Sequence, residues 1–236
     1  MKITPFPTSS LRFAAAALLL CGLMTGRVGA QILVAPTSYS ASSELNNTTY
    51  AVGNLFDGTI SSLVVGQSTG EGEQYAASGL NADNDFSPIV EMAFASTLTF
   101  SGVGYAQRNT STVSDQVSQI NLYFMTQPQY NNYTLAINTP PTNTQYTTEE
   151  TVTPTVVTNG SAPWEEYSFG GTVTAQYVVA QFIHDAPLGQ NSGDADNPGG
   201  SEFLMEEAAV PEPSTWALVL VGIAGLGLRR RFRALV

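Results

Sequence analysis

Apolar residues between positions 31 and 210 recur mainly at every second position. Between Gln119 and Met125, for example, Ile120, Leu122 and Phe124 fall on one face. A period of two is typical of β-strands, whereas helices repeat every 3.6 residues. Strand patterns occupy residues 38–42, 61–65, 89–94, 96–107, 119–125, 133–137, 152–157, 164–169, 172–183 and 202–205. Short strands separated by Gly, Asn and Pro predict an all-β fold, an antiparallel β-sandwich.

One strand pattern changes register at Gly102. Leu98 and Phe100 share a face before the glycine, and the apolar positions after it are Val103 and Tyr105. An extra residue in a strand reverses the faces of all the residues that follow, so the pattern predicts a bulge or bend at this glycine.

The segment from Thr172 to Ile183 carries apolar residues on both faces. One face has Val173, Ala175, Tyr177 and Val179, and the other has Val178, Ala180 and Phe182. This pattern predicts a central strand that is covered on both sides. Residues 127–151 and 185–201 are polar and rich in turn-forming residues, which predicts long loops, the first with at most a short strand.

The N-terminus has the organisation of a secretory signal peptide. Lys2 and Arg12 precede an apolar run over residues 13–24, and small residues follow at positions 28–30. Signal peptidase recognises this arrangement, so we expect cleavage between Ala30 and Gln31.

The C-terminus combines three signals in 27 residues. Val210-Pro211-Glu212-Pro213 interrupts secondary structure, because proline fixes φ and lacks an N–H donor. The uncharged run 216–228 would form a helix of roughly 20 Å, which spans a membrane only marginally. Arginines follow at positions 229, 230, 231 and 233. They predict a short transmembrane helix whose C-terminus stays in the cytoplasm.

This tail resembles the PEP-CTERM sorting signal of Gram-negative bacteria, in which the same three parts occur in the same order. The resemblance implies transient anchoring in the inner membrane, processing near Val210–Pro213 by an exosortase, and delivery to the cell surface or extracellular polysaccharide. The chain therefore divides into a signal peptide (1–30), a central region (31–209) and a sorting signal (210–236).

Removing the two targeting segments changes the charge. Of eight basic residues only Arg108 remains in the central region, against eighteen of the nineteen acids, which gives a formal charge of −17. Such a surface repels phosphate backbones and excludes nucleic acid as a partner. Solubility or bound cations would each explain the acidity. The central region has no cysteine, so it forms no disulfide and no thiolate metal site.

Several motifs of the central region follow one another in a recognisable order. They are S-A-S-S at 40–43 with Y-A-V-G-N-L-F-D-G-T at 50–59, L-T-F-S-G-V-G-Y-A-Q-R at 98–108 followed by the strand pattern at 117–124, T-A-Q-Y-V at 174–178, and G-S-E-F at 200–203. Together they resemble the discoidin or coagulation-factor C-type domains of the galactose-binding-like superfamily. The resemblance implies an eight-stranded jelly roll, and many members of this superfamily bind glycans or anionic lipids at one end. The single arginine of the central region disfavours anionic lipid.

Two features depart from this family. The family's usual arginine after the penultimate-strand tyrosine is absent, because Val178 follows Tyr177. The segment 127–151 is also longer than is usual, so the ligand loops are expected to be particular to this protein.

In carbohydrate-binding relatives a structural calcium lies where the D-G turn meets the closing strand. Carried over, this resemblance implies ligands from Asn54, Asp57, Thr59 and Glu202. Calcium takes six to eight hard oxygen ligands. These four residues would supply some of them, from two separate segments of the chain. The alternative is that Asp57 only caps a turn and that Glu202 is a surface acid.

Three residues are candidates for contact with a sugar. Arg108 follows Tyr105 at a position that some sugar-binding relatives use, and its guanidinium would either donate to hydroxyl groups or pair with a buried acid. Trp164 would either stack on a sugar ring or pack at a strand edge.

Catalytic motifs are absent from the sequence. His184 is the only histidine, so a Ser-His-Asp triad would depend on it alone, and no G-x-S-x-G or H-E-x-x-H occurs. We therefore expect a non-catalytic, surface-sorted protein that binds or organises extracellular polysaccharide. Two alternatives remain open, which are a structural matrix or adhesion protein without a ligand pocket, and a glycan-active hydrolase with a carboxylate pair.

Overall fold

The computed structural model describes residues 32–44, 50–58, 75–76, 85, 87–108, 116–156, 164–184 and 198–208. Residues 32–208 form one compact unit. The predicted signal peptide, its cleavage position at Ala30 and Gln31, the sorting residues Val210, Pro211, Glu212 and Pro213, the predicted transmembrane helix, the predicted strand at 61–65 and Thr59 lie outside the described residues. No helix in the described part of the chain is both long and apolar enough to cross a membrane.

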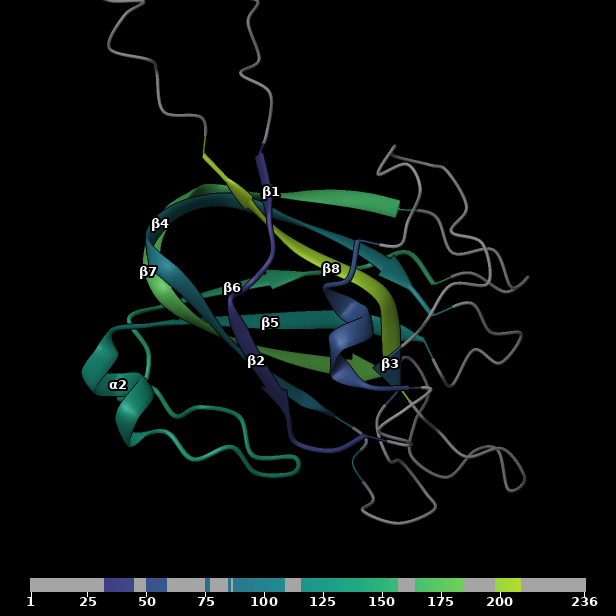
Figure 1. The fold of residues 1–236 in the computed structure, drawn as a ribbon, viewed down its shortest axis with the longest axis horizontal. Coiled ribbons are helices and arrows are strands. Elements are labelled where there is room, and N and C mark those ends of the chain that lie inside the picture. Colours follow the sequence, from purple (N-terminus) through teal and green to yellow (C-terminus); the bar gives the residue numbers. More distant parts are fainter. Residues whose placement is uncertain are drawn as a thin grey trace, which may run out of the picture. The chain divides into compact units, whose positions relative to one another are not determined.

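Eight antiparallel strands make up most of the described residues (Figure 1). They are β1 (Ile32–Val34), β2 (Ser38–Ala41), β3 (Tyr75–Ala76), β4 (Ile89–Gln107), β5 (Val117–Met125), β6 (Thr148–Val152), β7 (Trp164–His184) and β8 (Gly199–Glu207). A 3₁₀ helix, η1 (Val52–Leu55), and an α-helix, α2 (Gln127–Asn132), complete the set. The predicted all-β antiparallel fold is confirmed.

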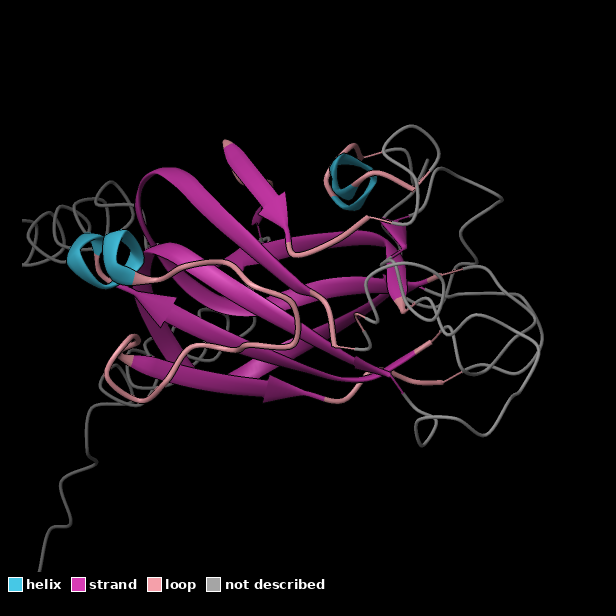
Figure 2. Ribbon diagram, turned by 90° about the horizontal axis from the view of Figure 1, so that it is seen from below, coloured by secondary structure: helices cyan, strands magenta, loops and turns pink. Residues whose placement is uncertain are grey.

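The strands form a sandwich of two layers (Figure 2). The two longest strands, β4 and β7, bend so that each contributes to both layers. The last part of β4 pairs with β8 and with the first part of β7, and β1 and β3 extend this layer along β8. The first part of β4 pairs with β2 and with the last part of β7, and β5 and β6 extend the second layer. The predicted segments 89–94 and 96–107 are thus one bent strand, as are 164–169 and 172–183.

The core lies between these layers and is rich in aromatic rings. Tyr105 lies 6.0 Å from Phe182, and Phe182 lies 5.6 Å from Phe203 in an edge-to-face arrangement, measured between ring centroids. Edge-to-face contacts of this kind add to the stabilisation that burial provides. Ile120, Leu122 and the other inward residues of β5 line the same core, as their pattern predicted.

The predicted register change at Gly102 is confirmed. Phe100, Val103 and Tyr105 all face the core, and the pairing of β4 with both neighbours shifts between Phe100 and Gly102. A side chain at Gly102 would collide with the Glu206 carboxylate and with the carbonyl oxygen of Tyr167, so the bend requires glycine here.

The assignment of faces in β7 was partly wrong. The four residues predicted to share one face do not, because Val173 and Ala175 face the core whereas Tyr177 and Val179 belong to a second cluster on the outer face. The core positions continue instead with Val178, Ala180 and Phe182. The pairing with β4 is irregular between Ala93 and Leu98, and the inward face of β7 changes parity at the same place.

The structure also corrects the segment between β5 and β6. Residues 133–137 form no strand, and the unpredicted helix α2 precedes them. Pro128 lies in the first turn of this helix, and the Thr126 N–H donates to Gln129 Oε1 at 2.9 Å. The alternating apolar residues Tyr133 and Leu135 instead pack a loop onto the outer face of β5 and β7. Strand β6 begins four residues before the predicted segment 152–157 and ends at Val152.

Candidate functional site

The turn from Val52 to Gly58 is anchored by the apolar side chains within it. Leu55 is fully buried, and the ring of Phe56 meets Phe203 of β8 edge to face at 6.3 Å. Gly58 has a φ of +68°, a conformation that glycine adopts without strain. Packing of η1 against β8 therefore brings the exposed Asp57 to the beginning of the closing strand.

Glu202 is the residue of β8 that meets this turn. It is 0% exposed, and no side chain donates a hydrogen bond to its carboxylate. Burial, and next the negative charge of Asp57, raise the pKa of Glu202 from 4.5 to about 8, while the Gly58 backbone lowers it in part. A buried acid without a compensating cation is costly, so this position calls for a proton or a positive ion.

The residues that the resemblance implies as calcium ligands are described in part, since Thr59 lies outside the described residues. Asn54 is buried in η1, Asp57 follows it in the same turn, and the buried Glu202 of β8 lies within reach of the Asp57 charge. In the described part of the chain no three acidic, histidine or cysteine side chains group together. Calcium also accepts backbone carbonyl oxygens and amide side chains, so two carboxylates are compatible with such a site.

Tyr105 lies near the end of β4, and Arg108 directly follows this strand. Tyr105 is buried in the core, and its hydroxyl donates to the carbonyl oxygen of Gly199 at 2.7 Å. Arg108 is 9% exposed, and its guanidinium carbon lies 5.0 Å from the centroid of the Tyr50 ring. The structure thus gives Tyr105 a structural role in holding β8, and it gives Arg108 a cation–π contact.

Trp164 does not reach the surface. Its ring is 0% exposed and packs with Ala106 and Leu204. A Cβ atom at Gly104 would come well inside 3.0 Å of this ring, so the glycine makes room for the indole. Burial of this kind corrects the interpretation of Trp164 as an exposed platform and agrees with the packing alternative.

Two features were not predicted from the sequence. Glu206 is buried above Gly102, and burial together with the charge of Glu166 raises its pKa to about 7. Tyr39 of β2 is exposed beside η1. Glu206 is an acid in a short strand, and Tyr39 stands between two serines. Both patterns are common in surface strands, so neither indicated a functional residue.

Comparison with known proteins identifies the tail. Residues 209–231 match the PEP-CTERM protein-sorting motif. The chain is therefore an exported surface protein that is anchored in the membrane during processing by an exosortase. No curated protein is similar to the chain.

Solved structures are similar to the chain at low sequence identity. A family 32 carbohydrate-binding module from C. perfringens NanJ, in complex with galactose, is 12% identical with a TM-score of 0.44, over 72% of this chain and 93% of the module. The third family 32 module of a family 31 glycoside hydrolase from Clostridium perfringens is 14% identical with a TM-score of 0.47, over 75% and 95%. The C-terminal domain of a chitobiase from Bacteroides fragilis is 10% identical with a TM-score of 0.46, over 76% and 100%. The chain thus carries a PEP-CTERM sorting motif on the C-terminal side of an antiparallel β-sandwich whose fold is similar to that of family 32 modules.

Proposed function

We propose that this protein is a non-catalytic β-sandwich that binds or organises extracellular polysaccharide at the surface of a Gram-negative bacterium. Signal peptidase removes residues 1–30, the inner membrane holds the chain transiently, and the exosortase acts near Val210–Pro213. The sorting motif supports this destination. The order of discoidin-like motifs along residues 40–203 supports the binding activity.

The meeting of the D-G turn with β8 is the observation that carries this proposal. In the discoidin-like pattern, the first and last motifs converge on one site. Here Asp57 lies close enough to Glu202 to raise its pKa, and no side chain donates a hydrogen bond to the Glu202 carboxylate. The D-G turn and β8, about 145 positions apart in sequence, therefore bring two carboxylates close together in addition to their apolar contacts. A bound cation would stabilise this arrangement.

Calcium would be held by Asn54, Asp57 and Glu202, with Thr59 as the further ligand that the family resemblance implies. The ion would neutralise the two carboxylates and tie the turn to the closing strand. The described part of the chain contains Arg108 as its one basic residue, and this arginine lies against Tyr50. We therefore assign calcium a structural role, in which the ion does not contact the sugar.

The sugar is most compatible with the charge of the domain if it is neutral. A formal charge of −17 over residues 31–209 repels uronic acids and phosphates. Hydroxyl groups hydrogen-bond to carboxylates and amides without this repulsion, so a neutral glycan suits the surface.

Retention on polysaccharide tests the proposal directly. The full chain, purified in a mild detergent, would be run in native gels that contain arabinogalactan, glucomannan, mixed-linkage β-glucan or alginate, with calcium or with EDTA. Retardation by a neutral polysaccharide supports binding, and no retardation by any of the four would refute it. Self-association without dependence on sugar would instead favour a structural matrix protein, and release of reducing ends would favour a hydrolase.

A further inference from the structure

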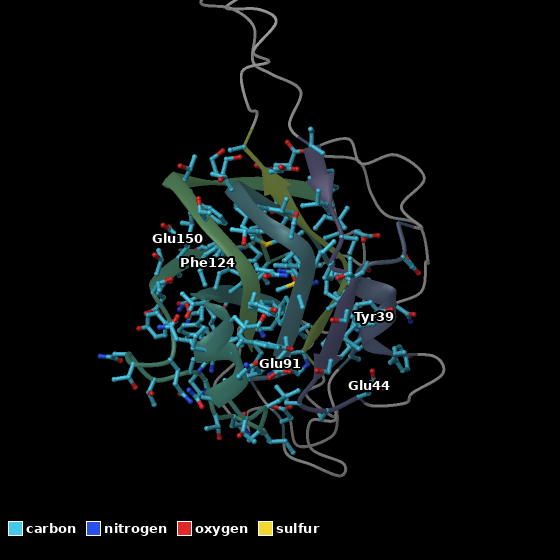
Figure 3. All side chains as sticks on the ribbon, turned by 60° about the vertical axis from the view of Figure 1, so that its left-hand side comes forward. Tyr39, Glu44, Glu91, Phe124 and Glu150 are labelled. Carbon is cyan, nitrogen blue, oxygen red and sulfur yellow. The ribbon has the colours of Figure 1, made fainter. Side chains whose placement is uncertain are left out.

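Tyr39 is the one exposed tyrosine of the chain. The structure describes all ten tyrosines, and the other nine are buried or half-buried. The exposed large apolar side chains in the described part of the chain are Tyr39, at 44%, and Ile32, at 54%. Ile32 begins the first strand, whereas Tyr39 lies in the middle of β2 beside η1 (Figure 3).

The ring of Tyr39 is held in one orientation from behind. Its centroid lies 4.9 Å from that of Phe56, with an angle of 34° between the ring planes. Its hydroxyl lies over Gly53, where even a Cβ atom would come within 3.0 Å of the oxygen. Aromatic packing below and a glycine beneath the hydroxyl therefore support the inner face, so little conformational entropy is lost when a ligand covers the exposed part.

The segment that Tyr39 packs against carries acidic side chains. Ser38 and Ser40 precede and follow Tyr39 on β2, and their side chains point to the opposite face of the strand, where Ser40 Oγ donates to Glu91 Oε2 at 3.1 Å. Glu44 lies near the start of η1, where its Oε1 accepts a hydrogen bond from the Val52 N–H at 2.8 Å. Asp57, exposed at the end of the turn, directly follows the Phe56 that supports the ring.

We propose that Tyr39 is the stacking platform for a neutral pyranose ring of the polysaccharide. A sugar ring presents a face of C–H groups to an aromatic ring and hydroxyl groups at its edge, which suits an exposed ring with acidic side chains on the neighbouring segment. Uronic acids are disfavoured by Glu44, Asp57 and the charge of the whole domain. This assignment rests on the proposed function, and it places the sugar beside the calcium turn because Phe56 contacts the ring and Asp57 would bind the ion.

A series of substitutions separates stacking from packing. Tyr39→Leu keeps an apolar cover over Phe56 but removes the flat ring, so we expect about tenfold weaker retention on the neutral polysaccharide that retards the wild type, with little change in Tm. Tyr39→Phe and Tyr39→Trp keep the ring and are expected to stay within about threefold of the wild type. Tyr146→Leu is the matched control, because Tyr146 is a half-buried tyrosine that packs against Tyr123 on another face.

A chemical measurement on the wild type covers the case in which Tyr39→Leu does not fold. Nitration of the full chain with tetranitromethane, mapped by mass spectrometry, is expected to modify Tyr39 first and to slow at Tyr39 when arabinogalactan or glucomannan is bound. Unchanged nitration at Tyr39 in the bound protein, or unchanged retention of a folded Tyr39→Leu, overturns the platform and leaves polysaccharide binding intact. Failure of the wild type to bind any polysaccharide refutes the proposed function itself.

Discussion

Glu202 is the residue at which burial and charge conflict most strongly. Its pKa of about 8 in the folded chain lies above the 4.5 of an unperturbed glutamate, because burial and Asp57 oppose its ionisation. A raised acid pKa stabilises the folded state fully below about pH 4.5, and this contribution is lost as the pH rises through 8. We therefore expect Tm in EDTA to fall between pH 5 and pH 8.5.

Calcium is expected to remove most of the fall in Tm between pH 5 and pH 8.5, since the ion takes the place of the proton on Glu202. An ion at about 100 times its dissociation constant adds about 2.7 kcal/mol, or roughly 5–10 °C in Tm. Melts in EDTA and in calcium across this pH range measure both effects. Glu206 contributes a fall of the same sign, so Glu202→Gln and Glu206→Gln are compared. A calcium shift that survives in Glu202→Gln would exclude the site.

Asp57→Asn gives opposite results with and without the ion. Without calcium, removing this negative charge lowers the pKa of Glu202 and relieves repulsion, so Tm in EDTA at pH 8 is expected to rise. With calcium, a carboxylate ligand is lost, and the stabilisation by the ion is expected to shrink. Titration of Tm against calcium concentration measures the two together. Equal shifts in wild type and variant would place the ion elsewhere.

At the scale of single elements, β4 is built around glycines that allow side chains from its neighbours to cross it. Trp164 of β7 lies across Gly104, and the Glu206 carboxylate lies over Gly102. Gly104→Ala would push against the buried indole, so we expect a loss of about 1–3 kcal/mol in the free energy of unfolding. Gly170→Ala is the control, because nothing lies near the added methyl group. Denaturant unfolding of both variants measures the difference, and equal stability would contradict the described packing.

The elements that the sequence predicted correctly are those whose pattern reflects one buried face. Strand β5 and the register change at Gly102 belong to this group, because each apolar side chain has one layer to pack against. Tyr133 and Leu135 also alternate, yet they lie in a loop, since a loop that packs onto an outer face uses apolar residues at the same spacing. Alternation of apolar residues therefore identifies which side chains are buried. Backbone pairing with a neighbouring strand decides whether those residues form a strand.

The candidate site was predictable only in part for a related reason. Motif order pointed to Asp57 and Glu202, and the structure brings them together. Trp164 and Tyr105 were also candidates for ligand contact, but both are buried, because their exposure depends on glycines and strands far away in sequence. Tyr39 has an unremarkable sequence context, and only the packing of η1 against β2 shows that its ring is supported and exposed.

At the scale of the whole molecule, both ends of the sandwich leave from neighbouring strands. Ile32 of β1 pairs with Glu207 of β8, and the sorting motif begins two residues after Glu207. The described chain therefore enters and leaves the sandwich on two paired strands. Each targeting segment also carries a charge of +3, since the signal peptide has three basic residues and the tail has four arginines and one glutamate.

Processing is therefore expected to change the net charge in two measurable steps. The full chain has a formal charge of −11, removal of residues 1–30 leaves −14, and cleavage before Pro211 leaves −17, whereas cleavage after Glu212 leaves −18 because that acid is retained. Isoelectric focusing and intact-mass measurement of the surface fraction distinguish these forms. A strain that lacks the exosortase should accumulate the −14 form in the membrane. Accumulation of this form at the surface of the wild-type strain would show that the tail is kept, and the arginines would then offset part of the acidity on which the preference for neutral sugar depends.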